Sequence, residues 1–208
     1  MLKIAVFVSG GGTNLQALID CQQKDGLGGG EITAVISSKR DAYALERAEN
    51  AGIKGYYVSA KGLSADEYGQ KLIELLEREI QPDLIVLAGF LKVLSPSFCE
   101  RYKGRMINIH PALIPSFCGD GMYGLKVHEA AIEKGVKVSG ATVHFVDVVT
   151  DGGPIILQKA VEVMDSDTPE SLQKRIMEEA EHILLPKAVR LYCAGALKIE
   201  NGRVRITK

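Results

Sequence analysis

Apolar residues along the chain form short continuous runs that alternate with segments of helical spacing. The runs at 2–8, 32–36 and 83–88 are rich in Val, Ile and Leu, which is typical of strands buried on both faces of a parallel sheet. Apolar residues recur every three or four positions from 13 to 24 and from 64 to 80, which predicts amphipathic helices. The alternation predicts an α/β fold with an open, doubly wound, mostly parallel sheet and right-handed crossovers.

The second half of the chain continues this alternation, but its last residues have the pattern of a β-hairpin. Asn201-Gly202 lies between two short alternating runs, which predicts a C-terminal β-hairpin. A last long helix is expected from Thr168 to about Leu191, and Pro186 predicts that it bends or stops early. The remaining expected elements are helices at 42–51, 96–102 and 125–134 and strands at 56–58, 105–109, 141–147 and 154–163.

Composition narrows the class of protein. The 25 basic and 26 acidic residues nearly balance, so nothing in the net charge indicates a nucleic-acid or membrane partner. The run at 2–8 has one lysine and no small-x-small cleavage pattern after it, which favours a core strand over a signal peptide and predicts a cytoplasmic protein. The four cysteines include no C-x-x-C pair, so we expect neither a disulfide framework nor a metal site.

A glycine-rich turn, Ser9-Gly10-Gly11-Gly12-Thr13-Asn14, joins the first strand to the first helix. Glycines let the backbone approach a ligand closely, and a helix N-terminus offers unpaired N–H groups, so the turn predicts a phosphate site. Thr13 or Asn14 is expected to cap the helix. The dinucleotide pattern G-x-G-x-x-G fails at Leu15, and no Gly-Lys-Ser/Thr follows. A tight turn without a ligand remains an alternative.

Three polar residues sit where strands are expected to end. Asn108 and His110 lie two positions apart, on one face of an extended strand, and Asp151 follows in a loop. An amide can donate to a developing oxyanion, an imidazole can move a proton near neutral pH, and a carboxylate can tune that imidazole. The trio suits acyl transfer without a covalent intermediate. A capping Asn, a structural His and a turn Asp are the alternatives.

Together these motifs closely resemble the glycinamide ribonucleotide formyltransferases, folate-dependent enzymes of purine biosynthesis. Asn-x-His-Pro with Asp-Gly-Gly marks the wider formyltransferase group, and the Gly12-Thr13-Asn14 turn narrows the resemblance to this branch. The resemblance covers nearly the whole chain, through the segments Ser9 to Gln16, Leu87 to Pro96, Asn108 to Pro115, Thr142 to Val146 and Asp151 to Gln158.

The resemblance implies roles for particular residues. It implies that Gly12, Thr13 and Asn14 hold the substrate's phosphate and that Glu181 contacts its ribose hydroxyls. Glu178 would be a poor neighbour for that phosphate unless it points away. The implied folate-binding residues are Leu91, Lys92, Val93, Leu94 and Asn108, the catalytic residues Asn108, His110 and Asp151, and the supporting residues Thr142 and His144.

The resemblance also implies one formyltransferase domain over 1–208, with a Rossmann-like, phosphate-binding half at 1–100 and a catalytic, folate-binding half at 101–208. The expected ligands are glycinamide ribonucleotide and 10-formyltetrahydrofolate as co-substrate, without metal. The expected assembly is a monomer or a homodimer. His144 can instead be a satisfied core histidine, and His128 and His182 are expected to be structural or solvated.

The expected chemistry is direct attack of the substrate amine on the formyl carbon. Asn108 would donate to the oxygen of the tetrahedral intermediate, and His110, held partly protonated by Asp151, would pass a proton toward the departing folate nitrogen. The competing classes are a related formyl-handling enzyme, a nicotinamide-dependent oxidoreductase and a phosphate-binding module without catalysis. A tRNA-directed formyltransferase or a formyltetrahydrofolate hydrolase would be expected to carry an additional domain.

Overall fold

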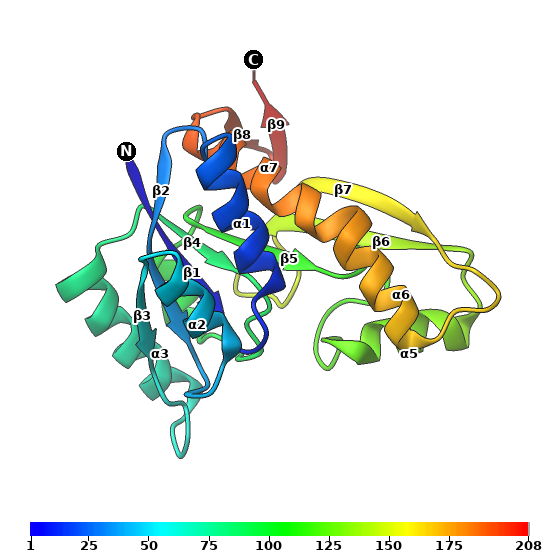
Figure 1. Ribbon diagram of the computed structural model, residues 1–208, viewed down its shortest axis with the longest axis horizontal. Helices are drawn as coiled ribbons and strands as arrows, with labels where there is room; N and C mark the ends of the chain where they lie inside the picture. Colours follow the sequence, from blue (N-terminus) through cyan, green and yellow to red (C-terminus); the bar gives the residue numbers. More distant parts are fainter. Residues whose placement is uncertain (208) are drawn as a thin grey trace.

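A seven-stranded sheet with helices on both faces forms the centre of the molecule (Figure 1). The computed structural model describes residues 1–207. The strand order is β3-β2-β1-β4-β5-β6-β7; β1 to β5 pair in parallel, and β6 and β7 continue the sheet antiparallel. The strands are β1 (Leu2–Val8), β2 (Gly30–Ser37), β3 (Lys54–Tyr57), β4 (Leu84–Leu87), β5 (Met106–His110), β6 (Val138–Phe145), β7 (Ile155–Glu162), β8 (Leu197–Glu200) and β9 (Arg203–Ile206).

The helical segments lie between the strands, as the apolar pattern predicts. Two of them contain a π turn, which inserts one residue into the helical repeat. The segments are α1 (Thr13–Lys24), α2 (Tyr43–Asn50), α3 (Ala65–Leu75) continued by η1 (Leu76–Ile80), α4 (Pro96–Arg101), α5 (Leu125–Lys134), and α6 (Pro169–Ile176) continued by η2 (Met177–Glu181) and α7 (His182–Cys193).

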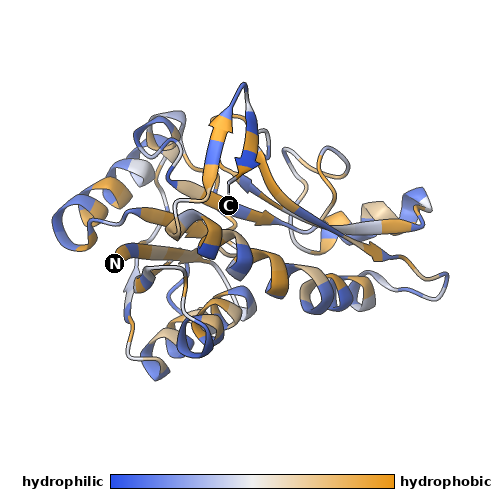
Figure 2. Ribbon diagram, turned by 90° about the horizontal axis from the view of Figure 1, so that it is seen from above, coloured by the Kyte–Doolittle hydropathy of each residue, from blue (hydrophilic) through white to orange (hydrophobic). Residues whose placement is uncertain are grey.

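Side chains of β1 alternate between two hydrophobic clusters, which explains the unbroken apolar run. Ile4 and Val6 pack with residues of α1, α2 and α7 on one face, whereas Ala5 and Phe7 pack with residues of α3 and α4 on the other. Figure 2 shows apolar residues gathered in the central strands and polar residues alternating with apolar ones along the helices. The predicted doubly wound, mostly parallel α/β sheet is therefore confirmed.

Local sequence signals explain several element boundaries. Ser64 begins α3 with a complete capping box, in which its hydroxyl accepts from the Glu67 N–H and the Glu67 carboxylate accepts from the Ser64 N–H. The hairpin β8–β9 forms around Asn201-Gly202 as predicted and projects beside the C-terminus (Figures 1 and 2). The last helix does not end at Pro186; it continues to Cys193, and its irregular turn lies earlier, at Met177–Glu181.

The strand order reverses between β1 and β4, because the chain runs outward from β1 through β2 to β3 and then returns to the other side of β1. In open α/β sheets, ligands bind at such a switch point, beyond the carboxyl ends of the strands. The glycine turn follows β1, the Gly89–Leu94 segment follows β4, and the loop after His110 follows β5. The topology therefore brings three segments of the sequence to one edge of the sheet.

Candidate active site

A cavity of about 520 Å³ opens at this edge of the sheet. It extends from the glycine turn, past the segment after β4, to the ends of β5 and β6. Of the residues with predicted roles, those that line it are Gly12, Thr13, Asn14, Leu91, Lys92, Val93, Leu94, Asn108, His144, Asp151 and Glu181. His110 and Thr142 are the two that do not line it; both are buried behind its wall.

The glycine turn forms one end of the cavity. Gly12 has a left-handed backbone (φ 73°), and a Cβ at this position would lie 2.6 Å from the Cβ of Ala44 in α2. Both the backbone conformation and the close approach require glycine. Gly12 is the N-cap of α1 and no side chain caps the helix, so the expected capping by Thr13 or Asn14 is wrong. The free N–H groups of the first turn are left for an anion.

Glu181 lies beside the glycine turn although it is 167 residues distant from Asn14. The Asn14 Nδ2 donates to Glu181 Oε2 at 2.5 Å, and the Asn14 Oδ1 is buried without a protein partner. Burial raises the pKa of the Glu181 carboxyl group, and the bond from Asn14 opposes this only in part. Glu178 is exposed and does not line the cavity; its carboxylate lies 3.9 Å from Lys174 Nζ.

Side chains of the paired strands β5 and β6 form the other end. Asn108 lies opposite His144 and His110 opposite Thr142, so the four side chains share one face of the pair. The His144 Nδ1–H donates to the carbonyl of Phe145 at 2.8 Å. In the neutral ring Nε2 is therefore an acceptor, and it accepts from Asn108 Nδ2 at 3.1 Å. The second N–H of the Asn108 amide is left available to a ligand.

Asp151 joins the two histidines. Its Oδ2 lies 3.5 Å from His110 Nδ1 and accepts from the Gly119 N–H at 2.9 Å, and its Oδ1 lies 3.6 Å from His144 Nε2. Burial raises the pKa of the Asp151 carboxyl group, but the contact with His144 in its protonated form, the Gly119 N–H and the charge of protonated His110 together outweigh burial, so the net pKa is lowered. Asp151 is therefore ionised at neutral pH.

His110 has a pKa below its usual value, opposite to the direction that the sequence predicts. Burial lowers this pKa more than the Asp151 carboxylate and the Phe117 carbonyl raise it. The His110 Nε2–H donates to that carbonyl at 2.8 Å, which leaves Nδ1 facing Asp151. The reason is that a spacing in the sequence indicates a nearby charge but not how completely the imidazole ring is removed from water.

Thr142 holds the loop that follows His110. Its hydroxyl donates to the Ala112 carbonyl at 2.7 Å and accepts from the Ile114 N–H at 3.1 Å and from Gln158 Nε2 at 3.0 Å. The side chain thus links β5, β6 and β7 at the point where the chain leaves the sheet. Thr142 supports the position of the loop and does not touch the cavity.

Several residues that line the cavity have no binding or catalytic role predicted from the sequence, among them Gln173, Met177 and His128. Gln173 and Met177 precede Glu181 by eight and four positions, a helical spacing that could have identified them. His128, expected to be structural or solvated, is fully buried and lines the cavity; neither ring nitrogen has a protein partner, and burial lowers its pKa to about 4. No pattern in the sequence distinguishes His128 from an ordinary helical histidine.

Among residues 1–207, no group of three or more His, Cys, Asp or Glu side chains is arranged to hold a metal ion. No helix in the same part of the chain has the length and apolar character needed to cross a bilayer.

A buried cluster of amide, imidazole and carboxylate groups, joined in one cavity to a helix N-terminus, defines a group-transfer site on a Rossmann-like sheet. The sequence profile of the formyl transferase family matches residues 2–189, so the chain belongs to the formyl transferase family.

The relatives of this chain include a phosphoribosylglycinamide formyltransferase, a trifunctional purine biosynthetic protein and a glycinamide ribonucleotide transformylase. It is 39% identical to the phosphoribosylglycinamide formyltransferase of Escherichia coli (strain K12) over 202 residues, which cover 97% of this chain and 92% of the relative. It is 40% identical to the human trifunctional purine biosynthetic protein adenosine-3 over 97% of this chain, which spans 19% of that protein. The crystal structure of glycinamide ribonucleotide transformylase 1 from Symbiobacterium toebii superimposes with a TM-score of 0.92 at 42% identity, covering 100% of this chain and 95% of the other.

Proposed function

We propose that the protein transfers the formyl group of 10-formyltetrahydrofolate to the amine of glycinamide ribonucleotide, a step of purine biosynthesis. The observation that carries the proposal is the single cavity that contains both the free N-terminus of α1 and the cluster of Asn108, His144 and Asp151. A phosphorylated amine held at the first end presents its nitrogen toward the second. The similarity to phosphoribosylglycinamide formyltransferases supports the same reaction.

The folate co-substrate is assigned to the segment after β4. Leu91 and Val93 are exposed at the cavity, 50% and 71%, and Leu94 is buried beside them. Exposed apolar side chains of this kind suit a flat aromatic ring, and the backbone groups of the segment suit its polar edge. Lys92 is the one cation among the described residues that line the cavity.

Asn108 is assigned to the oxygen of the tetrahedral intermediate. His144 accepts one N–H of the Asn108 amide and so fixes the direction of the other. The pair of His110 and Asp151 is assigned to proton transfer. His110 is neutral at neutral pH because of burial, and the negative charge that develops during attack raises its pKa. The pair can then hold the proton that leaves the attacking amine and return it to the departing folate nitrogen.

The assay that tests this function uses the purified protein with both substrates and follows release of tetrahydrofolate and formation of the formylated amide. Turnover that requires both substrates supports formyl transfer. Release of formate without the amine would favour a hydrolase. No turnover with both substrates bound would overturn the proposal and favour a binding module.

The expectation that the chain acts as a monomer or homodimer in the cytoplasm is part of the same proposal. Sedimentation of the purified protein would measure the first, and localisation of the tagged chain the second.

A further inference from the structure

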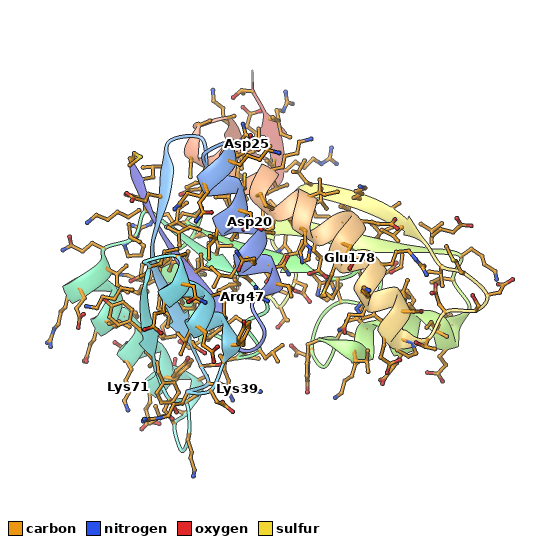
Figure 3. All side chains as sticks on the ribbon, viewed as in Figure 1. Asp20, Asp25, Lys39, Arg47, Lys71 and Glu178 are labelled. Atoms are coloured by element: carbon orange, nitrogen blue, oxygen red, sulfur yellow. The ribbon has the colours of Figure 1, made fainter. Side chains whose placement is uncertain are left out.

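Arg47 contacts the glycine turn from the neighbouring helix α2. Its Nε donates to the Gly11 carbonyl at 2.8 Å, and its Nη1 donates to Gln16 Oε1 at 2.9 Å. The guanidinium lies over the ring of Tyr43, 4.9 Å from the centroid. Figure 3 shows Arg47 beside the end of α1 at which the turn lies. Arg47 is not among the cavity-lining residues, so it approaches the turn from behind.

The direction of the Gly11 carbonyl determines the direction of the next N–H. In a trans peptide the C=O of one residue and the N–H of the next point in opposite directions. The bond from Arg47 directs the Gly11 carbonyl away from the cavity, and so directs the Gly12 N–H toward it. Within residues 1–207 the Gly12 N–H donates no hydrogen bond to another backbone group.

We propose that Arg47 is a positioning residue for the phosphate of the substrate. It orients the Gly12 N–H through the Gly11 carbonyl and places a positive charge behind the turn. This assignment rests on the proposed function, because it takes the phosphate of glycinamide ribonucleotide as the anion.

The charges of the cavity explain why such a cation matters. The described lining residues include four carboxylates, Asp120, Asp147, Asp151 and Glu181, against the single lysine Lys92. Lys92 belongs to the segment after β4, and no Lys or Arg lines the glycine turn itself. Backbone N–H groups and the dipole of α1 then supply most of the attraction for an anion, and a guanidinium bonded to the turn adds to it.

Two variants and a matched control test this role. Arg47→Met removes the charge and the donor, and Arg47→Lys restores the charge without the planar donor group. Arg40→Met is the control, because the Arg40 guanidinium also lies over a tyrosine ring, that of Tyr57, at 5.1 Å, but does not contact the turn. Steady-state kinetics with each substrate varied in turn, and melting temperature, are measured for all four proteins.

We expect Arg47→Met to raise the KM for glycinamide ribonucleotide about tenfold, the loss typical of one charge-assisted hydrogen bond. The kcat and the KM for the folate should stay within about twofold of wild type, Arg47→Lys should recover part of the loss, and Arg40→Met should match wild type. An unchanged KM for glycinamide ribonucleotide in folded Arg47→Met would overturn the inference. Equal changes in both KM values and kcat would also overturn it, because they would indicate a general structural role.

A second measurement separates this inference from the proposed function. Inorganic phosphate is titrated into ¹⁵N-labelled protein while the amide signals of Gly12 and Thr13 are followed by NMR. Wild type should show saturable shifts at these amides, and Arg47→Met should need about ten times more phosphate. If these shifts are observed but the wild-type protein transfers no formyl group, the proposed function is contradicted and the role of Arg47 is not. Absence of the wild-type shifts, or equal titrations in both proteins, would contradict the role of Arg47.

Discussion

The two ends of the cavity present different kinds of group to a ligand: backbone N–H groups at one end and side chains at the other. At the glycine turn, the groups that face a ligand are backbone N–H groups, and the critical residue, Gly12, has no side chain. At the ends of β5 and β6, they are side chains of Asn108, His144 and Asp151, held by hydrogen bonds and a close His144–Asp151 contact. A backbone site keeps its charge at any pH, whereas a side-chain site depends on pKa values set by burial. We therefore expect substitutions to separate binding at one end from chemistry at the other.

The largest effects are expected at the side-chain end. Asn108→Ala, His110→Ala and Asp151→Asn should each lower kcat by about 10²–10³, as is typical when a group that stabilises a transition state is removed. Asn108→Asp keeps the shape of the side chain but cannot donate, so it should be as impaired as Asn108→Ala. Steady-state assays at saturating substrates measure the effect, and circular dichroism verifies the fold. A kcat near wild type in folded His110→Ala would contradict the assignment.

The end of the cavity formed by side chains should also contribute to the loss of folding stability in acid. The unfolded chain protonates His128 below about pH 6.5, whereas burial in the folded state holds its pKa near 4. Because the folded pKa is the lower one, stability falls as the pH drops from about 6.5 to about 4, by about 3 kcal/mol in total.

His128→Leu should remove that part of the loss. Urea unfolding at pH 7.5 and pH 4.5 measures it, with the variant showing the smaller difference between the two values. Parallel stability curves for the two proteins would show that His128 does not titrate in this way.

At the backbone end, Gly12→Ala should raise the KM for glycinamide ribonucleotide by about tenfold or more and change kcat much less. The new methyl group would lie 2.6 Å from the Ala44 Cβ, so the turn and its N–H groups must shift. The double variant Gly12→Ala/Ala44→Gly should recover a small part of the affinity, because it removes the contact with the Ala44 Cβ but leaves the residue 44 Cα at 2.9 Å and the left-handed backbone. A Gly12→Ala protein with normal KM would show that the turn does not hold the substrate.

The smallest effect is expected at Thr142, which supports the loop after β5 without touching the cavity. Thr142→Val keeps the shape but removes the donor to Ala112 and the acceptor for Ile114, and should cost about 1–3 kcal/mol of unfolding free energy. Thr142→Ser keeps the hydroxyl and is the control. Thermal and urea denaturation compare the two, and equal stability of both variants would exclude the hydrogen bonds as the cause.

Elements that depend on local pattern could be read from the sequence. The strand at β4, the helix α5 and the hairpin at Asn201-Gly202 each follow from apolar spacing or turn chemistry within a few residues. The clustering of Asn108 with Asp151 followed from motif resemblance and from the expectation that chemistry gathers at strand ends.

Features that depend on distant contacts could not be read in this way. The bond of Asn14 to Glu181 and that of Arg47 to Gly11 join segments 167 and 36 positions apart. The direction of the His110 pKa depends on competition between burial and the Asp151 charge, and neither magnitude is encoded in a local pattern. The π turn before His182, which presents Glu181 to the cavity, was also not predicted.

The most direct test of the division between anchoring and chemistry is a single-turnover measurement on Asn108→Ala with both substrates saturating. The dissociation constant of the same variant for glycinamide ribonucleotide is measured alongside. We predict that the rate of formyl transfer falls by about 10²–10³, while the dissociation constant stays within about twofold of wild type. A wild-type rate in the folded variant, or a loss confined to substrate affinity, would contradict the separation of chemistry from anchoring.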